Sequence, residues 1–196
     1  MLNENFVIVG AIIAGLGSLS YLIDTVKGKI QPNRVTFFFW SLAPLVAFAA
    51  EIKEGVGIQS LLTFMVGFTP LLILIASFAN KKSYWKLGSF DYICGILSFL
   101  GLTLWYITGK GNIAIFFSIL ADILAALPTY VKSYHHPETE NSWGYSTAAI
   151  NAIITVLTIK KWNFGYYAFP IYTICLDLSL FALIQFKLGK KLSKLL

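Results

Sequence analysis

The chain has 196 residues, of which 57% are hydrophobic and only 12% are charged. A soluble domain carries about 25% charged residues, so this composition excludes an ordinary soluble protein and places most of the chain in lipid. The formal net charge is +6, but the basic residues stand in short gaps between apolar runs. That distribution excludes a nucleic-acid-binding face and is typical of loops held on the cytoplasmic side of a membrane.

Seven apolar runs approach the roughly 20 residues that a helix needs to cross a bilayer. Clusters of Gly, Pro, Asn and Lys separate them. In chain order they lie near 6–26, 34–51, 57–79, 88–108, 112–134, 143–160 and 164–187. We therefore predict an all-α integral membrane protein with seven transmembrane helices.

The lysines predict the orientation of these helices. With the N-terminus outside, eleven of the fifteen basic residues fall in inner loops and the C-terminal tail, and four fall in outer loops. The positive-inside rule then favours an N-terminus outside and a C-terminus inside. We expect an integral protein of the plasma (inner) membrane of a prokaryote.

The first run carries the small residues Gly10, Ala14 and Gly17 on one helical face. Small side chains let two helices approach closely in a membrane. The spacing predicts a close contact between this helix and a neighbour.

One loop pattern occurs twice in the chain. When residues 22–40 are laid over 127–145, Lys27 matches Lys132 and Pro32 matches Pro137. Repeats in the same orientation are a sign of transporter folds. They predict two parallel three-helix bundles joined by a linker helix, a 3+1+3 plan. The corresponding units are 1–83 (first bundle), 84–110 (linker helix) and 111–196 (second bundle).

The second copy of this pattern, "LPTYVKSYHHPETE", resembles the segment that names the PQ-loop superfamily, in the Pro-Thr form of SWEET (MtN3) sugar transporters. The resemblance rests on Pro128, Thr129, Tyr130 and Lys132. The first copy reads Ile-Asp where the second reads Pro-Thr, so the chain resembles a divergent member. The resemblance implies a small transporter that works by alternating access.

Ionisable and amide side chains inside the runs mark a candidate site. Asp122, Asn151 and Asp177 lie about eight to thirteen residues into the fifth, sixth and seventh runs. A charged side chain at such depth costs ~2.5–3.5 kcal/mol on insertion scales, so it faces a cavity or a partner. A carboxylate in a medium of low dielectric can also exchange a proton, which makes Asp122 and Asp177 candidates for proton coupling.

Polar residues extend this site along two helices. Thr147 lies one turn before Asn151, and Thr173 lies one turn before Asp177. We expect these faces to converge on an aqueous cavity, and Trp40 of the second run could stack against a solute there. The alternative is that the threonines and Asn151 only join helices through hydrogen bonds.

Four prolines interrupt the runs and are candidate hinges: Pro44, Pro70, Pro128 and Pro170. Proline inside a transmembrane helix frees a backbone carbonyl and permits bending. A fixed kink is the alternative for each.

The sequence offers few residues that could form a catalytic site or a metal site. The only histidines, His135 and His136, lie with Glu138 and Glu140 in what we interpret as a solvated loop. They cannot complete a metal site or a Ser-His-Asp arrangement. We expect no enzyme activity, no cofactor and no metal. An intramembrane aspartyl enzyme is disfavoured because its Gly-x-Gly-Asp sequence is absent.

The function predicted from the sequence is a small secondary transporter of a polar solute, such as a sugar, an amino acid or a vitamin-like molecule. It works by alternating access and is facilitative or coupled to H+. The expected partners are that solute and the lipid bilayer, not nucleic acid, and a homo-oligomer is left open. The alternatives are a non-transporting membrane receptor with a fold like the KDEL receptor, and a channel.

Overall fold

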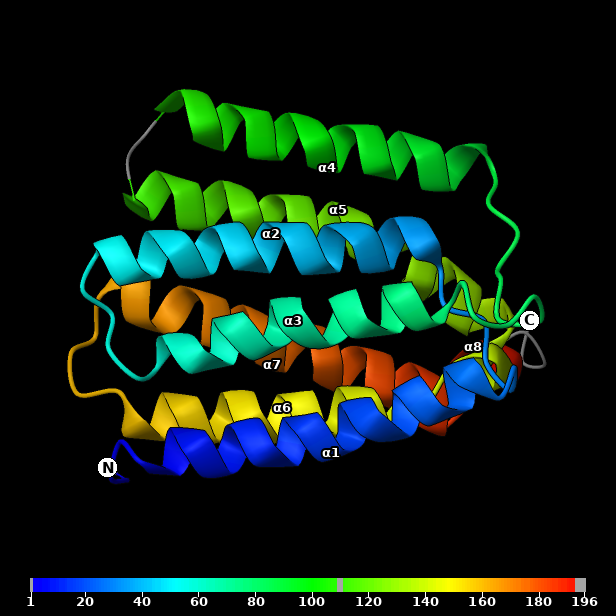
Figure 1. The fold of residues 1–196 in the computed structure, drawn as a ribbon, viewed down its shortest axis with the longest axis horizontal. Helices are drawn as coiled ribbons and strands as arrows, with labels where there is room; N and C mark the ends of the chain where they lie inside the picture. The colour runs from blue at the N-terminus through cyan, green and yellow to red at the C-terminus, as the bar shows by residue number, and fades with distance from the viewer. Residues whose placement is uncertain (1, 109–110, 193–196) are drawn as a thin grey trace.

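The computed structural model describes residues 2–108 and 111–192. Within those ranges every regular element is helical. Long helices lie side by side along a common direction (Figure 1). They are α1 (Phe6–Val26), α2 (Arg34–Lys53), α3 (Ser60–Ala76), α4 (Ser89–Thr108), α5 (Gly111–His135), α6 (Ser142–Thr158) and α7 (Phe164–Gln185). A 3-10 turn, η1 (Pro137–Thr139), precedes α6, and a short helix, α8 (Leu188–Leu192), follows α7.

Each of the seven apolar runs contains one of these long helices, with ends that shift by up to three residues. Asparagine side chains cap the N-terminal ends of three of these helices. Asn33 accepts hydrogen bonds from the backbone N–H groups of the first turn of α2, Asn141 does the same for α6, and Asn163 does so for α7. These side chains satisfy N–H groups that have no partner within their own helix.

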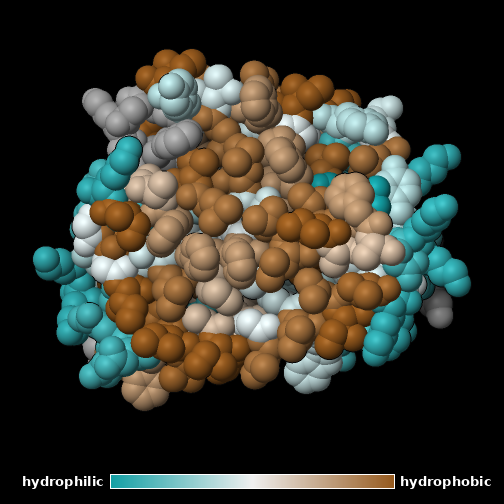
Figure 2. Space-filling view, viewed as in Figure 1, coloured by the Kyte–Doolittle hydropathy of each residue, from teal (hydrophilic) through white to brown (hydrophobic). Residues whose placement is uncertain are grey.

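The surface of the bundle is that of a membrane protein. Figure 2 shows a broad apolar band between two hydrophilic ends. Large apolar side chains such as Leu16, Phe99 and Ile107 stay exposed, which a soluble monomer avoids. The chain is therefore an all-α protein with the features of membrane embedding, as predicted.

Four helices of the described chain are long and apolar enough to cross a membrane: Phe6–Val26, Arg34–Lys53, Ile115–His135 and Phe164–Gln185. Two shorter apolar stretches, α3 (Ser60–Ala76) and the Ser89–Leu104 part of α4, fall below that length among the residues whose side chains the structure describes. The α6 helix has 17 residues and spans about 26 Å at 1.5 Å per residue, less than the ~30 Å of hydrocarbon.

For the description that follows, we call α1, α2 and α3 the first group and α5, α6 and α7 the second group. In the first group α3 contacts both α1 and α2, and in the second α7 contacts both α5 and α6. The groups meet where α1 packs on α6 and where α2 packs on α5. The remaining helix, α4, lies on α5 at the edge of the bundle (Figure 1).

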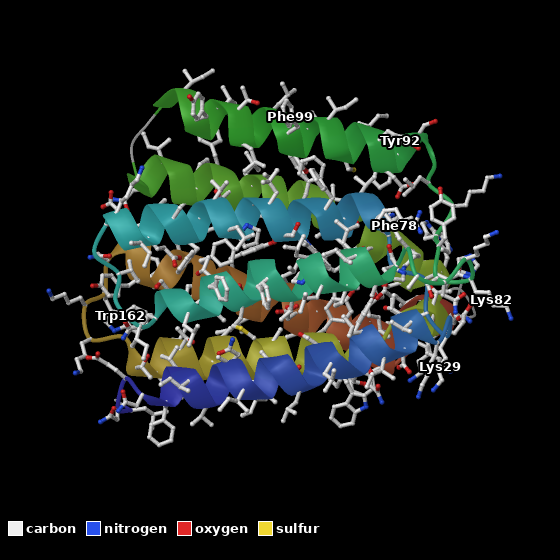
Figure 3. The ribbon with its side chains drawn as sticks, viewed as in Figure 1. Lys29, Phe78, Lys82, Tyr92, Phe99 and Trp162 are labelled. Atoms are coloured by element: carbon white, nitrogen blue, oxygen red, sulfur yellow. The ribbon has the colours of Figure 1, made fainter. Side chains whose placement is uncertain are left out.

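Two ends of the bundle can be told apart by their labelled side chains. Lys29 and Lys82 project from one end, which we call the basic end, and Trp162 lies at the other, which we call the Trp162 end (Figure 3). The α2 and α6 helices begin at the basic end, so the first turns of both lie there.

Candidate functional site

A cavity lies between the two groups of helices. Its walls come from six helices and surround about 600 Å³ of space free of protein atoms, measured out to its open side. The centre of a water-sized sphere can reach about 70 Å³ of this space. The lining residues are Ser18 and Tyr21 of α1; Phe37 and Trp40 of α2; Val66, Thr69, Pro70 and Ile73 of α3; Asp122 of α5; Gly144, Tyr145 and Ala148 of α6; and Tyr172, Thr173, Leu176 and Asp177 of α7.

Asp122 is the most enclosed acid of the cavity, with 1% of its surface exposed. The Tyr172 hydroxyl donates a hydrogen bond of 2.5 Å to Asp122 Oδ2. The other carboxyl oxygen, Oδ1, is buried and has no partner among the described residues. The Trp40 indole N–H donates to the backbone carbonyl of Asp122 at 3.4 Å, which ties α2 to α5 beside this acid.

Asp177 lines the same cavity from α7 and is 7% exposed. No hydrogen bond or ion pair reaches its carboxyl group from the described part of the chain. Thr173 lies one turn earlier on the same wall, and its hydroxyl donates to the Phe169 carbonyl at 2.9 Å. The structure thus brings four of the predicted site residues, Asp122, Asp177, Thr173 and Trp40, to one cavity.

Four aromatic rings from α1, α2 and α6 form a closed ring of contacts in the cavity wall. The ring centroids of Tyr21 and Phe37 are 5.3 Å apart, and those of Phe37 and Trp40 are 5.5 Å apart. Trp40 lies 6.1 Å from Tyr145, and Tyr145 lies 6.3 Å from Tyr21. Most of these contacts are edge-to-face, the geometry that aromatic pairs prefer. We call these four residues the aromatic box.

Thr147 and Asn151 do not reach the cavity. Both lie where α6 packs on α1, and a Cβ atom added at Gly10 would come within 2.4 Å of Asn151 Oδ1. A Cβ atom at Gly17 would come within 1.8 Å of Thr147 Oγ1. The small face of α1 therefore makes the close helix contact predicted for it, and α6 supplies the neighbour. The amide of Asn151 is buried there without a hydrogen-bond partner in the described chain.

The four candidate hinge prolines each lie inside a helix, in α2, α3, α5 and α7. Only Pro70 lines the cavity.

A buried ionic network borders the cavity through two of its lining residues, Tyr21 and Tyr145. Lys132 and Glu140 form an ion pair whose side chains are 1% and 0% exposed. The Tyr21 hydroxyl donates to Glu140 Oε2 at 2.5 Å, and the Tyr145 hydroxyl donates to the same oxygen at 3.0 Å. Two rings of the aromatic box therefore carry this network into the cavity wall. The interpretation of Glu140 as a solvated loop residue is wrong, whereas Glu138 in the same loop is exposed.

The network also joins the two groups of helices. The Lys132 ammonium donates to the Gln31 carbonyl at 2.6 Å, and the Gln31 N–H donates to the Thr139 carbonyl at 3.0 Å. Asn141 donates to Ser20 at 3.2 Å and to Asp24 at 2.8 Å. Because Gln31, Ser20 and Asp24 belong to the first group, the loop between α5 and α6 is fastened to the loop between α1 and α2.

Another buried acid, Glu51, lies near the Trp162 end of α2 and is 1% exposed. Thr63 of α3 donates to its Oε1 at 2.9 Å, while Oε2 has no partner in the described chain. Sequence reasoning missed this residue because it is the last residue of its predicted run, where an acid is usually solvated. Lys53 and Glu54 follow it directly and strengthen that impression.

Comparison with known proteins adds no relative: family models, curated protein sequences and solved structures were searched, and none matches this chain. The arrangement of the site must therefore support a function by itself. It offers two buried acids, an aromatic box and no basic side chain in the cavity lining.

Proposed function

We propose that the protein is a small secondary transporter that moves a polar solute across a membrane by alternating access. One observation carries the proposal. A cavity lies between the first and second groups of helices, and two buried carboxyl groups line it. Acidic side chains within transmembrane helices are rare and mark substrate or proton pathways.

The proposal includes seven transmembrane helices in a 3+1+3 plan with the N-terminus outside. The packing supports a repeat, because α3 contacts both α1 and α2 as α7 contacts both α5 and α6. The α1–α6 contact also corresponds to the α5–α2 contact when the two groups are exchanged. An asparagine caps the second helix of each group, Asn33 in one and Asn141 in the other. Transporters with parallel repeats bind solute at the interface between such units.

We also propose that the chain is a divergent member of the PQ-loop superfamily. Pro128 and Thr129 lie in the last turns of α5, and Lys132 follows one turn later. In this protein that segment ends at the ionic network beside the cavity. The placement of the motif next to the cavity supports its resemblance to a transporter motif. The membrane would be the plasma membrane of a prokaryote.

Asp122 is the better candidate for proton coupling of the two acids. Its hydrogen bond from Tyr172 joins α5 to α7, so a change in its protonation would alter a contact between helices. The prolines within α2, α3, α5 and α7 are candidate hinges for the accompanying movement, since they weaken the helix backbone where they occur.

Uptake of a solute panel into proteoliposomes, with and without a pH gradient, tests the proposal. The wild-type protein should show saturable uptake of at least one solute. Asp122→Asn should retain exchange of that solute but lose accumulation driven by the gradient. Glu138→Gln changes an exposed acid outside the cavity and should leave both activities intact.

Three results would contradict parts of the proposal. A solute that binds but is never moved would favour a receptor, and flux without saturation would favour a channel. Gradient-driven accumulation by Asp122→Asn would remove Asp122 from the coupling.

A further inference from the structure

The charge of the cavity lining restricts the solute. Two carboxyl groups line the cavity, and none of the described lining residues is Lys or Arg. Lys132 is bound to Glu140 and to the Gln31 carbonyl, and it is not part of the lining. An anionic solute would find no cation in this cavity, and its own charge would face Asp122 and Asp177. A solute with a carboxylate is excluded for the same reason.

The carboxyl groups retain unused hydrogen-bond acceptors. Asp122 Oδ1 is buried without a partner, and no donor of the described chain reaches the carboxyl group of Asp177. Buried polar atoms are nearly always hydrogen-bonded, and an unmade bond to a charged group is costly. The N–H groups of a protonated amine would supply both the missing donors and the missing positive charge, and a quaternary ammonium ion would supply the charge.

The aromatic box supplies the complementary surface. Tyr21, Phe37, Trp40 and Tyr145 present four rings to the same cavity, with neighbouring centroids 5.3 to 6.3 Å apart. The face of an aromatic ring attracts a cation, and Trp attracts it most strongly. Such boxes are the usual site for alkylated ammonium groups in proteins. Because Trp40 also bonds to the Asp122 backbone, the box and the acids belong to one site.

We propose that this cavity binds a small organic cation that has no carboxylate: an alkylated amine or a quaternary ammonium compound. This inference rests on the proposed function, and it narrows the polar solute to one charge class. Asp177 balances the charge of the ammonium group, and the aromatic box contacts its alkyl groups. A neutral sugar could donate hydroxyl hydrogen bonds to the acids, but it would gain none of the attraction between a carboxylate and a cation in a medium of low dielectric.

Binding to the purified full chain in detergent tests this proposal, by thermal shift and by isothermal titration calorimetry. Matched pairs of probes isolate the charge. Choline is compared with its neutral carbon isostere 3,3-dimethyl-1-butanol, and 1,5-diaminopentane is compared with free L-lysine, which adds a carboxylate. Glucose and sodium chloride serve as neutral and ionic controls. We expect choline or 1,5-diaminopentane to bind, and the isostere, free L-lysine and glucose to bind at least about tenfold more weakly.

Two variants probe the site and two serve as controls. Asp177→Asn and Trp40→Leu should each weaken cation binding by about tenfold or more. Glu138→Gln and Trp162→Leu change an exposed acid and an exposed indole far from the cavity and should bind as the wild type does. If a cavity variant does not fold, the wild-type comparison of choline with its isostere still decides the matter.

The proposal is overturned if the neutral isostere binds as tightly as choline, if Asp177→Asn binds the cation as the wild type does, or if neither cation binds. Uptake into proteoliposomes separates this result from the transporter proposal. A cation that binds without being transported would contradict the transporter and support the ligand class. Saturable transport of a neutral solute, without cation binding, would support the transporter and contradict the ligand class.

Discussion

Glu138 and Glu140 lie two residues apart and have opposite environments. Glu138 is exposed, and a hydrogen bond from the Lys190 ammonium lowers the pKa of its carboxyl group. Glu140 is buried with Lys132 and accepts hydrogen bonds from Tyr21 and Tyr145. The 3-10 turn between the end of α5 and Asn141 produces this difference, because it turns one acid outward and the next inward.

Glu140→Gln is predicted to destabilise the protein strongly. It leaves Lys132 charged, buried and without its counter-ion, and the loss of one partner of a buried pair costs about 3–5 kcal/mol. Glu138→Gln is the matched control and should change the free energy of unfolding by less than about 0.5 kcal/mol, because its ion pair is exposed. Unfolding by SDS titration in mixed micelles measures both. Equal stability of the two variants would contradict the buried pairing.

The candidate site was predicted in part, and the outcome at each residue has a physical reason. Depth within an apolar run identifies Asp122 and Asp177, because a buried acid is costly wherever it points. Depth does not identify the face of a helix. Thr147 and Asn151 have the same four-residue spacing as Thr173 and Asp177, yet they face α1 and not the cavity.

Other cavity residues could not be recognised from the sequence. Tyr21 and Tyr145 lie near the ends of their helices, where aromatic residues usually anchor a protein at the membrane interface. Both donate a hydrogen bond to Glu140, and Tyr21 is more than a hundred positions away from that acid in the sequence. No local pattern in the chain encodes such a contact.

At the scale of elements, the α1–α6 contact depends on glycine. A Cβ atom at Gly17 would lie within 2.8 Å of three side-chain atoms of Thr147, whereas one at Gly15 would lie 3.8 Å from Met65. These two positions are two residues apart on one helix and face different neighbours. Backbones can approach closely only where the side chain is this small.

Gly17→Ala is therefore predicted to destabilise the protein by about 1–3 kcal/mol, the usual cost of inserting a methyl group into a packed interface. Gly15→Ala should change the free energy of unfolding by no more than about 0.5 kcal/mol. The same SDS titration measures both variants. A Gly17→Ala protein as stable as the Gly15→Ala protein would show that α1 and α6 are less tightly packed than the structure indicates.

At the scale of the whole molecule, the helices were more predictable than their course through a membrane. Apolar runs bounded by Asn, Gly and Pro marked every long helix, because these residues cap or end helices wherever they occur. The sequence predicts the length of each membrane span less well than it predicts the presence of each helix. The α6 helix ends at Thr158, short of the length that four other helices reach, since Lys160 and Lys161 follow directly.

The orientation of the bundle in the membrane can be tested by labelling cysteines at its two ends. In a background without Cys94 and Cys175, a single cysteine in place of Lys82 should be labelled by an impermeant thiol reagent only after cells are opened. A cysteine in place of Lys160 should be labelled in intact cells. The reason is the excess of lysines at the basic end, which the positive-inside rule assigns to the cytoplasm. The reverse labelling pattern would place the N-terminus inside.

The ionic network at the basic end has a consequence for how the bundle could open there. Lys132, Glu140 and Tyr145 all belong to the second group of helices, so their mutual bonds can persist while the groups part. Separation of the groups would interrupt the hydrogen bonds that reach across to Tyr21 and Gln31, and those from Asn141 to α1. Each of these hydrogen bonds contributes about 1–3 kcal/mol net, and water can replace the lost partner when this end opens. The charged pair can thus travel intact on one side of the opening, and the exit needs no separation of charge.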